Sequence, residues 1–305
     1  MRDKLILAVK GFCMGAADVV PGVSGGTMAF ILGIYERFLA ALKSFDSVWL
    51  KYVVTLQVKP AIQYPHFGFL IPLALGLFSA LVFFTRVIPI PQLLHTHPEP
   101  IYGLFFGLII GSVITLLPQL ERFDRISSFF VTLGIALGWT VVNLVPTSTP
   151  DTPVFIFFSG MLAISAMLLP GISGSFILLM LRKYETIFSG IGRFDLWIIA
   201  PFALGALAGL IVFSRFLSWL LSHYHRETLA TIIGILIGSL WVIWPFQIRK
   251  YEVIREKERL ISSTPYFPDS LSQPVSFAIL MAIIGTVAVL VINYLATKKT
   301  SSPAT

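Results

Sequence analysis

The sequence predicts an all-α polytopic membrane protein made of two inverted-topology repeats, each a broken, re-entrant helix pair followed by three transmembrane helices. Of its 305 residues, 56% are hydrophobic and 12% are charged, with a mean hydropathy of +0.86. About a quarter of the residues of a soluble protein are charged, so this composition indicates a membrane protein. A proline-glycine motif occurs twice, as PGVSGGT at residues 21–27 and as PGISGS at residues 170–175. Apolar runs follow both copies in the same order.

The match between the two copies extends beyond the motif. It continues at a constant separation of 149 residues through three further pairs, Leu32 and Leu181, Tyr35 and Tyr184, and Glu36 and Glu185. An ungapped match of this kind indicates a duplication. We therefore divide the chain into a first repeat at residues 1–149, a second at 150–297 and a short polar tail at 298–305, with both repeats in one integrated membrane domain.

In the first half, one apolar arm covers about residues 5–20 and a second covers 24–42, with Pro21 and Gly22 between them. Each arm is short for a spanning helix of about 20 residues, so the pair is interpreted as a re-entrant hairpin. Three longer apolar runs follow near residues 67–88, 101–118 and 128–146, and these are long enough to cross.

The second half repeats this order. The broken pair is expected near residues 154–169 and 173–189, and the crossings near 196–221, 229–246 and 275–297. The crossings themselves carry matched residues, because Pro72, Gly76 and Arg86 fall onto Pro201, Gly205 and Arg215 at a separation of 129.

The number of crossings predicts the topology. If each broken pair enters and leaves by one face, each half makes three net crossings, and the odd number inverts the second half. One face then holds the N-terminal segment, 43–66, 119–127, 216–228 and the C-terminus, and the other holds 86–100, 146–153, 190–195 and 247–274. The first face carries more Lys and Arg, which favours a cytoplasmic N-terminus.

The positive charge does not indicate a nucleic-acid partner. The net charge is +7, but the basic residues lie mainly in short loops between apolar runs. This is the pattern of membrane orientation, with anionic lipid as a secondary partner. Cys13 is the single cysteine, and no Cys/His set has the spacing of a zinc site. No cofactor or metal ion is expected.

Each motif copy has the chemistry of an anion site. Proline and glycine interrupt one helix, and the Ser-Gly that follows starts another, whose first N–H groups lack helical partners and attract negative charge. The expected contacts to a phosphate or carboxylate are Ser24, Gly25, Gly26 and Thr27 in the first loop and Ser173, Gly174 and Ser175 in the second. Two such loops from inverted halves would meet near the bilayer midplane.

The motif has two other interpretations. Glycine and serine also permit close packing between membrane helices, and this alternative stays open. Residues 22–26 satisfy the G-x-S-x-G pattern of a hydrolase nucleophile, but no strand precedes them and the second copy ends in Ser175, so that interpretation is rejected.

Three acidic residues are candidates for coupling transport to a proton or sodium ion. Asp18 lies three residues before the first motif, while Met167 takes its place in the second copy, and intramembrane acids are costly. Glu36 and Glu185 follow the two loops, beside basic residues with which they could instead form salt bridges. Arg86 and Arg215 could guide an anionic headgroup or extend to the interface.

The residues 15–27 (GAADVVPGVSGGT) with Tyr35 and Glu36, and residues 169–175 (LPGISGS) with Tyr184 and Glu185, resemble the bacterial polyprenyl-phosphate transporters called PopT. The resemblance covers nearly the whole chain in segment order. It implies a non-enzymatic flippase in the bacterial cytoplasmic membrane that returns undecaprenyl phosphate to the inner leaflet for envelope synthesis.

Two other classes remain open from the residues alone. A small-anion channel or exchanger could use the same paired helix N-termini. A membrane lipid phosphatase is less consistent with the sequence, because no clustered catalytic residues are evident on its loops. The sequence leaves the coupling ion, the carrier-lipid selectivity and the assembly into a homo-oligomer undetermined.

Overall fold

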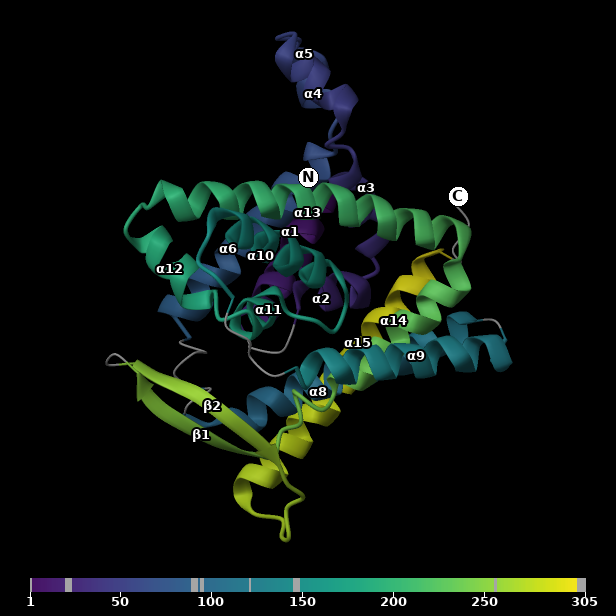
Figure 1. Ribbon diagram of the computed structural model, residues 1–305. Coiled ribbons are helices and arrows are strands. Elements are labelled where there is room, and N and C mark those ends of the chain that lie inside the picture. The colour runs from purple at the N-terminus through teal and green to yellow at the C-terminus, as the bar shows by residue number, and fades with distance from the viewer. Residues whose placement is uncertain are drawn as a thin grey trace.

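The computed structural model describes residues 2–19, 24–88, 93, 96–120, 122–144, 149–254 and 257–300 (Figure 1). Its helices before residue 149 are α1 (Arg2–Asp18), α2 (Gly25–Ile31), α3 (Tyr35–Lys43), α4 (Ser47–Val54), α5 (Val58–Gln63), α6 (Phe67–Arg86), α8 (Pro98–Leu116), the 3-10 helix η1 (Leu117–Leu120) and α9 (Arg125–Val142). The later elements are α10 (Pro153–Leu168), α11 (Gly174–Met180), α12 (Tyr184–Gly192), α13 (Leu196–His223), α14 (His225–Ser239), β1 (Gln247–Ile254), β2 (Lys257–Pro265) and α15 (Gln273–Thr300).

Five of the described helices are long and apolar enough to cross a membrane, namely α6, α8 with η1, α9, α13 and α15. They confirm five of the six predicted crossings. The sixth, expected near residues 229–246, is wrong in extent, because α14 ends at Ser239 after 15 residues. At 1.5 Å per residue it is about 22 Å long. Ten of its residues are buried, so α14 is an internal helix of the bundle.

The broken pairs are present, with one correction to each. The second arm was predicted as a continuous segment, but in both copies it is two helices, α2 and α3 in the first and α11 and α12 in the second. A left-handed residue separates them, Gly33 (φ 64°) in the first copy and Arg182 (φ 52°) in the second. Such a residue ends a helix. These two breaks are themselves 149 residues apart, so the repeat includes this detail.

The packing of the broken pairs also repeats. In the first half α1 packs against α6, and in the second α10 packs against α13. A Cβ added to Gly76 would lie 1.9 Å from the Ala8 carbonyl oxygen, and one added to Gly205 would lie 1.9 Å from the Phe157 carbonyl oxygen. Gly205 follows Gly76 by 129 residues and Phe157 follows Ala8 by 149, which are the separations found in the sequence.

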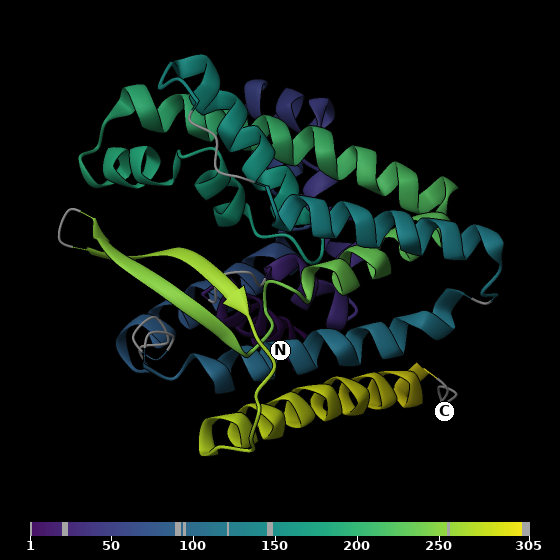
Figure 2. The same cartoon turned by 60° about the horizontal axis from the view of Figure 1, so that its bottom comes forward.

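The remaining long helices, together with α14, pair between the two halves. Helix α8 packs along α15, as Figure 2 shows, and α9 packs along α14. Glycine again sets these contacts: a Cβ on Gly134 would lie 2.2 Å from the Thr231 carbonyl oxygen, and one on Gly285 would lie 2.3 Å from that of Leu104. Each half therefore buries helices of the other, as expected for one integrated domain. The boundary near residue 149 and the inversion of the second half stay predictions.

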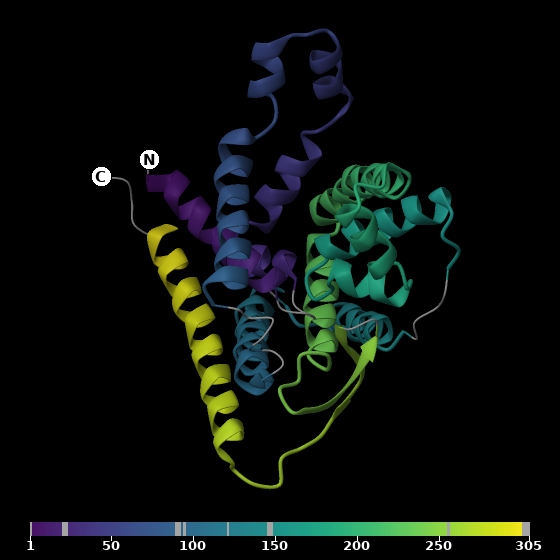
Figure 3. The same cartoon turned by 90° about the vertical axis from the view of Figure 1, so that its left-hand side faces the viewer.

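The connections between the helices include short helices and a hairpin. Figure 3 shows α4 and α5 projecting from the bundle on one side and the β1–β2 hairpin lying toward another. Arg226 Nη1 lies 3.2 Å from Asp124 Oδ2, which joins the 119–127 and 216–228 connections as their predicted common face requires, while the assignment of the other loops to two faces stays a prediction. The connection predicted at residues 247–274 contains the antiparallel hairpin of β1 and β2, and the rest of the described fold confirms the all-α prediction.

The helix contact at Gly76 gives a stability prediction. Gly76→Ala should lower the free energy of unfolding by about 1–3 kcal/mol, because the added methyl group forces α1 and α6 apart. Gly68→Ala on the same helix is the matched control, since nothing lies within 4 Å of a Cβ at that position. Thermal unfolding in detergent should show a lower Tm for Gly76→Ala than for Gly68→Ala. Equal transitions in the two variants would contradict the close helix contact.

Candidate functional site

The two motif copies lie together at the centre of the bundle, where α2 and α11 face each other's loops (Figure 1). Ser24 is the N-cap of α2, and its Oγ accepts a hydrogen bond from the Gly26 N–H at 3.1 Å. The same hydroxyl donates to the Met167 carbonyl oxygen at 3.2 Å, at the end of α10. Pro21 and Gly22 of the first motif lie outside the described residues.

Two further hydrogen bonds join the copies directly. The Gly171 N–H donates to Thr27 Oγ1 at 2.8 Å, and the Tyr35 hydroxyl donates to the Leu168 carbonyl oxygen at 2.6 Å. Thr27 and Tyr35 are buried. Gly171 has a φ of +91°, which favours glycine over any other residue there. The prediction that the two loops meet is therefore confirmed.

Asp18 occupies the start of α2. Its Oδ1 accepts a hydrogen bond from the Gly25 N–H at 2.7 Å. A Cβ on Gly25 would lie 2.6 Å from Asp18 Oδ2, so glycine is needed for the carboxylate to come this close. A carboxylate already sits where the sequence predicted a bound anion. In the second copy the corresponding residue, Met167, offers only its backbone carbonyl to Ser24.

The motif glycines serve packing in this conformation. A Cβ on Gly26 would lie 2.7 Å from the Met167 carbonyl oxygen, and one on Gly174 would lie 2.6 Å from that of Ala163. The close-packing alternative weighed from the sequence thus accounts for both residues. It does not account for the serines of the second copy.

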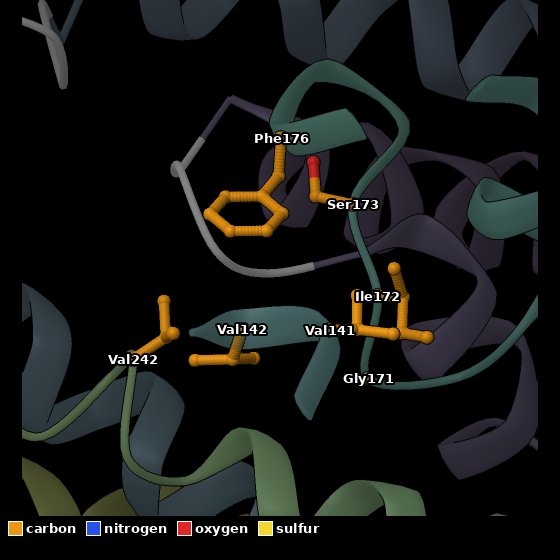
Figure 4. A pocket seen from close by; sticks show the side chains of 7 residues that line it. All are labelled: Val141, Val142, Gly171, Ile172, Ser173, Phe176 and Val242. Atoms are coloured by element: carbon orange, nitrogen blue, oxygen red, sulfur yellow. The ribbon is translucent and has the colours of Figure 1, made fainter. Parts of the chain in front are cut away.

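The hydroxyls of the second loop are accessible. Ser173 and Ser175 lie 2.8 Å apart at their Oγ atoms in an exposed hydrogen bond, whereas Ser24 and Thr27 are each 1% exposed. Ser173 borders a small hollow whose other lining residues are Val141, Val142, Gly171, Ile172, Phe176 and Val242 (Figure 4). The first loop carries more polar groups, but the protein itself uses them, so the second loop is the one open to a ligand.

The two arginines lie near opposite ends of α6. Arg86 is the exposed last residue of α6, at its far end from Phe67. Arg215 lies inside α13, which continues to His223, so unlike its counterpart Arg86 it does not end its helix. The pKa of Asp46 is lowered chiefly by the Trp49 N–H, and the charge of Arg215 adds to this lowering.

Because the charge of Arg215 affects the pKa of Asp46, the two side chains lie near each other. Asp46 follows Phe45, whose ring lies 5.9 Å from the ring of Phe67 at the start of α6, so Arg215 also lies near the start of α6. Arg86 is 19 residues further along α6, or about 28 Å away along the helix axis. One headgroup cannot contact both arginines at once.

The glutamates lie away from the motif serines. Glu36 Oε1 is 3.9 Å from His225 Nδ1, and both side chains are exposed. Its neighbour Arg37 instead stacks on Phe69, 4.6 Å from the ring centroid. Glu185 lies in the first turn of α12.

Sequence reasoning missed two contributors. Tyr35 is predicted only as a repeated residue, yet its hydroxyl joins the two copies.

Lys183 is 2% exposed, and its ammonium binds the Asp151 carboxylate and the Thr149 carbonyl oxygen. It fixes the break between α11 and α12 to the segment that joins the two halves. A lysine inside an apolar stretch was the available signal.

Comparison with known proteins identifies relatives of the whole arrangement. A family model described as undecaprenyl phosphate translocase-like matches residues 14–261. A protein of Vibrio cholerae serotype O1 named polyprenyl-phosphate transporter is 39% identical over 239 residues, covering 78% of this chain and 77% of its own length. A Staphylococcus aureus protein with the same name is 36% identical over 267 residues, covering 79% of this chain and 87% of its own.

No solved structure gives a significant match. The family match includes both motif copies and the helices between them, and it agrees with the resemblance stated from the motifs. The chain is a multi-pass membrane protein that belongs to the undecaprenyl phosphate translocase-like family.

Proposed function

We propose that this protein moves undecaprenyl phosphate, or a related polyprenyl phosphate, across the bacterial cytoplasmic membrane without chemical change to the lipid. Family membership and the names of both relatives support the substrate. The observation that carries the mechanism is the direct contact of the two motif copies through Thr27 and Gly171. A lipid monophosphate suits such a place, because its head is anionic while its tail can remain in the bilayer.

The headgroup first engages the second loop. Ser173 and Ser175 present hydroxyls that can donate to phosphate oxygens, and Gly174 lets the backbone lie close to them. Hydrogen bonds to a charged group are the strong class. Ser24, Gly25, Gly26 and Thr27 complete the site after their present partners are released.

Asp18 controls the release of the Gly25 N–H. Its carboxylate holds the Gly25 N–H, so a phosphate and an ionised Asp18 compete for one donor and repel each other. A proton or sodium ion on Asp18 removes the repulsion and weakens its hydrogen bond to Gly25. The phosphate then takes the donor, and this exchange couples the ion to the lipid.

The remaining charged residues have supporting roles. Arg86 and Arg215 receive the headgroup at the two ends of its path, since they lie too far apart to act together. Glu36 and Glu185 are secondary coupling candidates. The loop charges favour a cytoplasmic N-terminus, and assembly as a homo-oligomer is compatible with this mechanism.

Transport itself can be measured in proteoliposomes that contain labelled undecaprenyl phosphate in one leaflet. The purified protein should move the lipid between leaflets, with no release of inorganic phosphate and little electrical current. A chloride or phosphate current without lipid movement would instead support an anion channel. Release of inorganic phosphate would instead support the membrane lipid phosphatase.

The serines of the second loop should decide headgroup affinity. Ser173→Ala with Ser175→Ala should slow transport by roughly ten- to a hundredfold, since one hydrogen bond to a charged group is worth about 1.5–3 kcal/mol. Ser24→Ala should act partly through stability, because Ser24 is buried. Ser189→Ala is the matched control, because this exposed serine bonds the Thr186 carbonyl oxygen within its own helix. Wild-type transport by the Ser173/Ser175 variant would remove these residues from the site.

Coupling can be tested at Asp18. Asp18→Asn keeps an acceptor for the Gly25 N–H but cannot titrate, so transport should lose its dependence on a proton or sodium gradient. Asp195→Asn serves as control, because Asp195 caps α13 and asparagine caps equally well. Initial rates with and without each imposed gradient give the comparison. A wild-type gradient response in Asp18→Asn would exclude Asp18 from coupling.

A further inference from the structure

An apolar groove of about 380 Å³ lies between α8, α15 and the segment after α14. Phe106 and Ile110 line it from α8, and Trp244, Pro245 and Phe246 close one end. The residues of α15 that line it are Ala278, Ile279, Ala282, Ile283, Thr286 and Val287. The volume falls within the range of about 300–1,000 Å³ that is typical of small-molecule sites.

The groove has no polar group available to a ligand. Thr286 is its one hydroxyl, and the single proton of that hydroxyl is shared between the Gly107 and Ala282 carbonyl oxygens, 3.0 and 2.9 Å away. The Trp244 Nε1–H donates to the Tyr266 carbonyl oxygen at 3.0 Å, so Trp244 contributes an apolar ring surface to the groove and no free donor. Such a lining binds hydrocarbon and offers nothing to a headgroup.

The groove opens on the side that faces lipid. Ile279, Ile283 and Val287 are 42%, 55% and 49% exposed, on a helix long and apolar enough to cross the membrane. Helices α8 and α15 cannot move closer together to close the groove, because their backbones are already in contact. A Cβ on Gly107 would lie 1.9 Å from the Ala282 carbonyl oxygen. A chain in the bilayer can therefore enter sideways.

One short segment joins this groove to the motif hollow. Val242 lines the hollow together with Ser173, and Trp244 to Phe246, which begin two residues later, line the groove. Figure 4 shows Val242 at the edge of the hollow across from Phe176 and Ser173. A lipid with its phosphate at Ser173 would therefore pass its first tail carbons by Val242 to reach the groove at Trp244.

We propose that this groove, lined by Phe106, Trp244 and the α15 residues, binds the isoprenoid chain of the transported lipid while its phosphate is at the second motif loop. The inference rests on the proposed function and adds a tail site to it. The groove thereby selects a polyprenyl phosphate over a phosphate that lacks a long chain. It also keeps the lipid attached to the protein while the headgroup crosses.

The test fills the groove and compares substrates of two chain lengths. Ile283→Trp with Val287→Trp places indole rings in the groove. Ile284→Trp with Val291→Trp is the matched control on the same helix, at positions 44% and 49% exposed that do not line the groove. Each protein is assayed in proteoliposomes for undecaprenyl-phosphate transport, and for inhibition of that transport by dimethylallyl phosphate, which has the head without the long tail.

The groove variant should bind undecaprenyl phosphate about tenfold more weakly, the effect of losing the burial of roughly two methylene groups. Inhibition by dimethylallyl phosphate should be unchanged or stronger, which also shows that the variant is folded. Equal undecaprenyl-phosphate affinity in the groove and control variants would overturn the tail site while leaving transport intact. An equal loss for both compounds would overturn it too, because the substitutions would then act through the headgroup site.

A second measurement uses the unaltered protein. Undecaprenyl phosphate with a photoreactive group in its chain should label α8 and α15 peptides, and unlabelled undecaprenyl phosphate should compete. Labelling of the same peptides by a phospholipid with the group in its acyl chain, without competition, would mean that bulk lipid fills the groove. Crosslinks between two copies of the chain at these residues would mean that it is a subunit contact. Failure of the wild-type protein to transport would instead reject the proposed function.

Discussion

The hydrogen bond from the Gly171 N–H to Thr27 Oγ1 is the contact on which the central arrangement depends. A helix that breaks inside a membrane leaves backbone groups without partners, and no water is present in the hydrocarbon region to satisfy them. Here each broken copy satisfies part of the other: Thr27 accepts from Gly171, while Ser24 and Tyr35 donate to carbonyl groups at the end of α10. The contact between the copies therefore supplies hydrogen-bond partners that each break lacks within its own copy.

The same bonds restrict how the site moves. If one loop shifts to admit a ligand, the buried groups of the other lose their partners, at a cost of about 1–3 kcal/mol for each orphaned group. A concerted rearrangement of both loops avoids that loss, because the groups can exchange partners together. The exposed Ser173–Ser175 pair and the Asp18–Gly25 bond are the contacts whose release leaves the bridge between the copies in place.

Much of this arrangement was predictable from the sequence, since it depends on features that repeat. Pro-Gly motifs and apolar runs located the breaks and crossings, and the separations of 149 and 129 residues paired them, including Gly76 with Gly205, whose matching helix contacts the structure shows. The short length of α14 was not predictable, because its apolar residues continue past Ser239 into a turn whose shape depends on packing. The left-handed Arg182 escaped notice because arginine gives no such signal, whereas its counterpart Gly33 does.

The candidate site was predictable in composition and only partly in geometry. Residue types placed serines, glycines and Asp18 at two breaks, and the structure brings these breaks together. Which hydroxyls are buried depends on contacts between the two copies, and the sequence pattern of one copy does not contain this information. Ser24 and Thr27 form hydrogen bonds with the second copy and are buried, whereas the hydroxyls of Ser173 and Ser175 stay accessible.

The short α14 has an electrical consequence. It is about 22 Å long against a hydrocarbon core of about 30 Å, and Gly171 lies against Ile235 and Ser239 at its C-terminal end. The helix stops short of the full core, and the motif hollow lies beside the end that stops short. A phosphate at the hollow has therefore crossed only part of the membrane voltage, from which each elementary charge gains about 2.3 kcal/mol per 100 mV over the full drop.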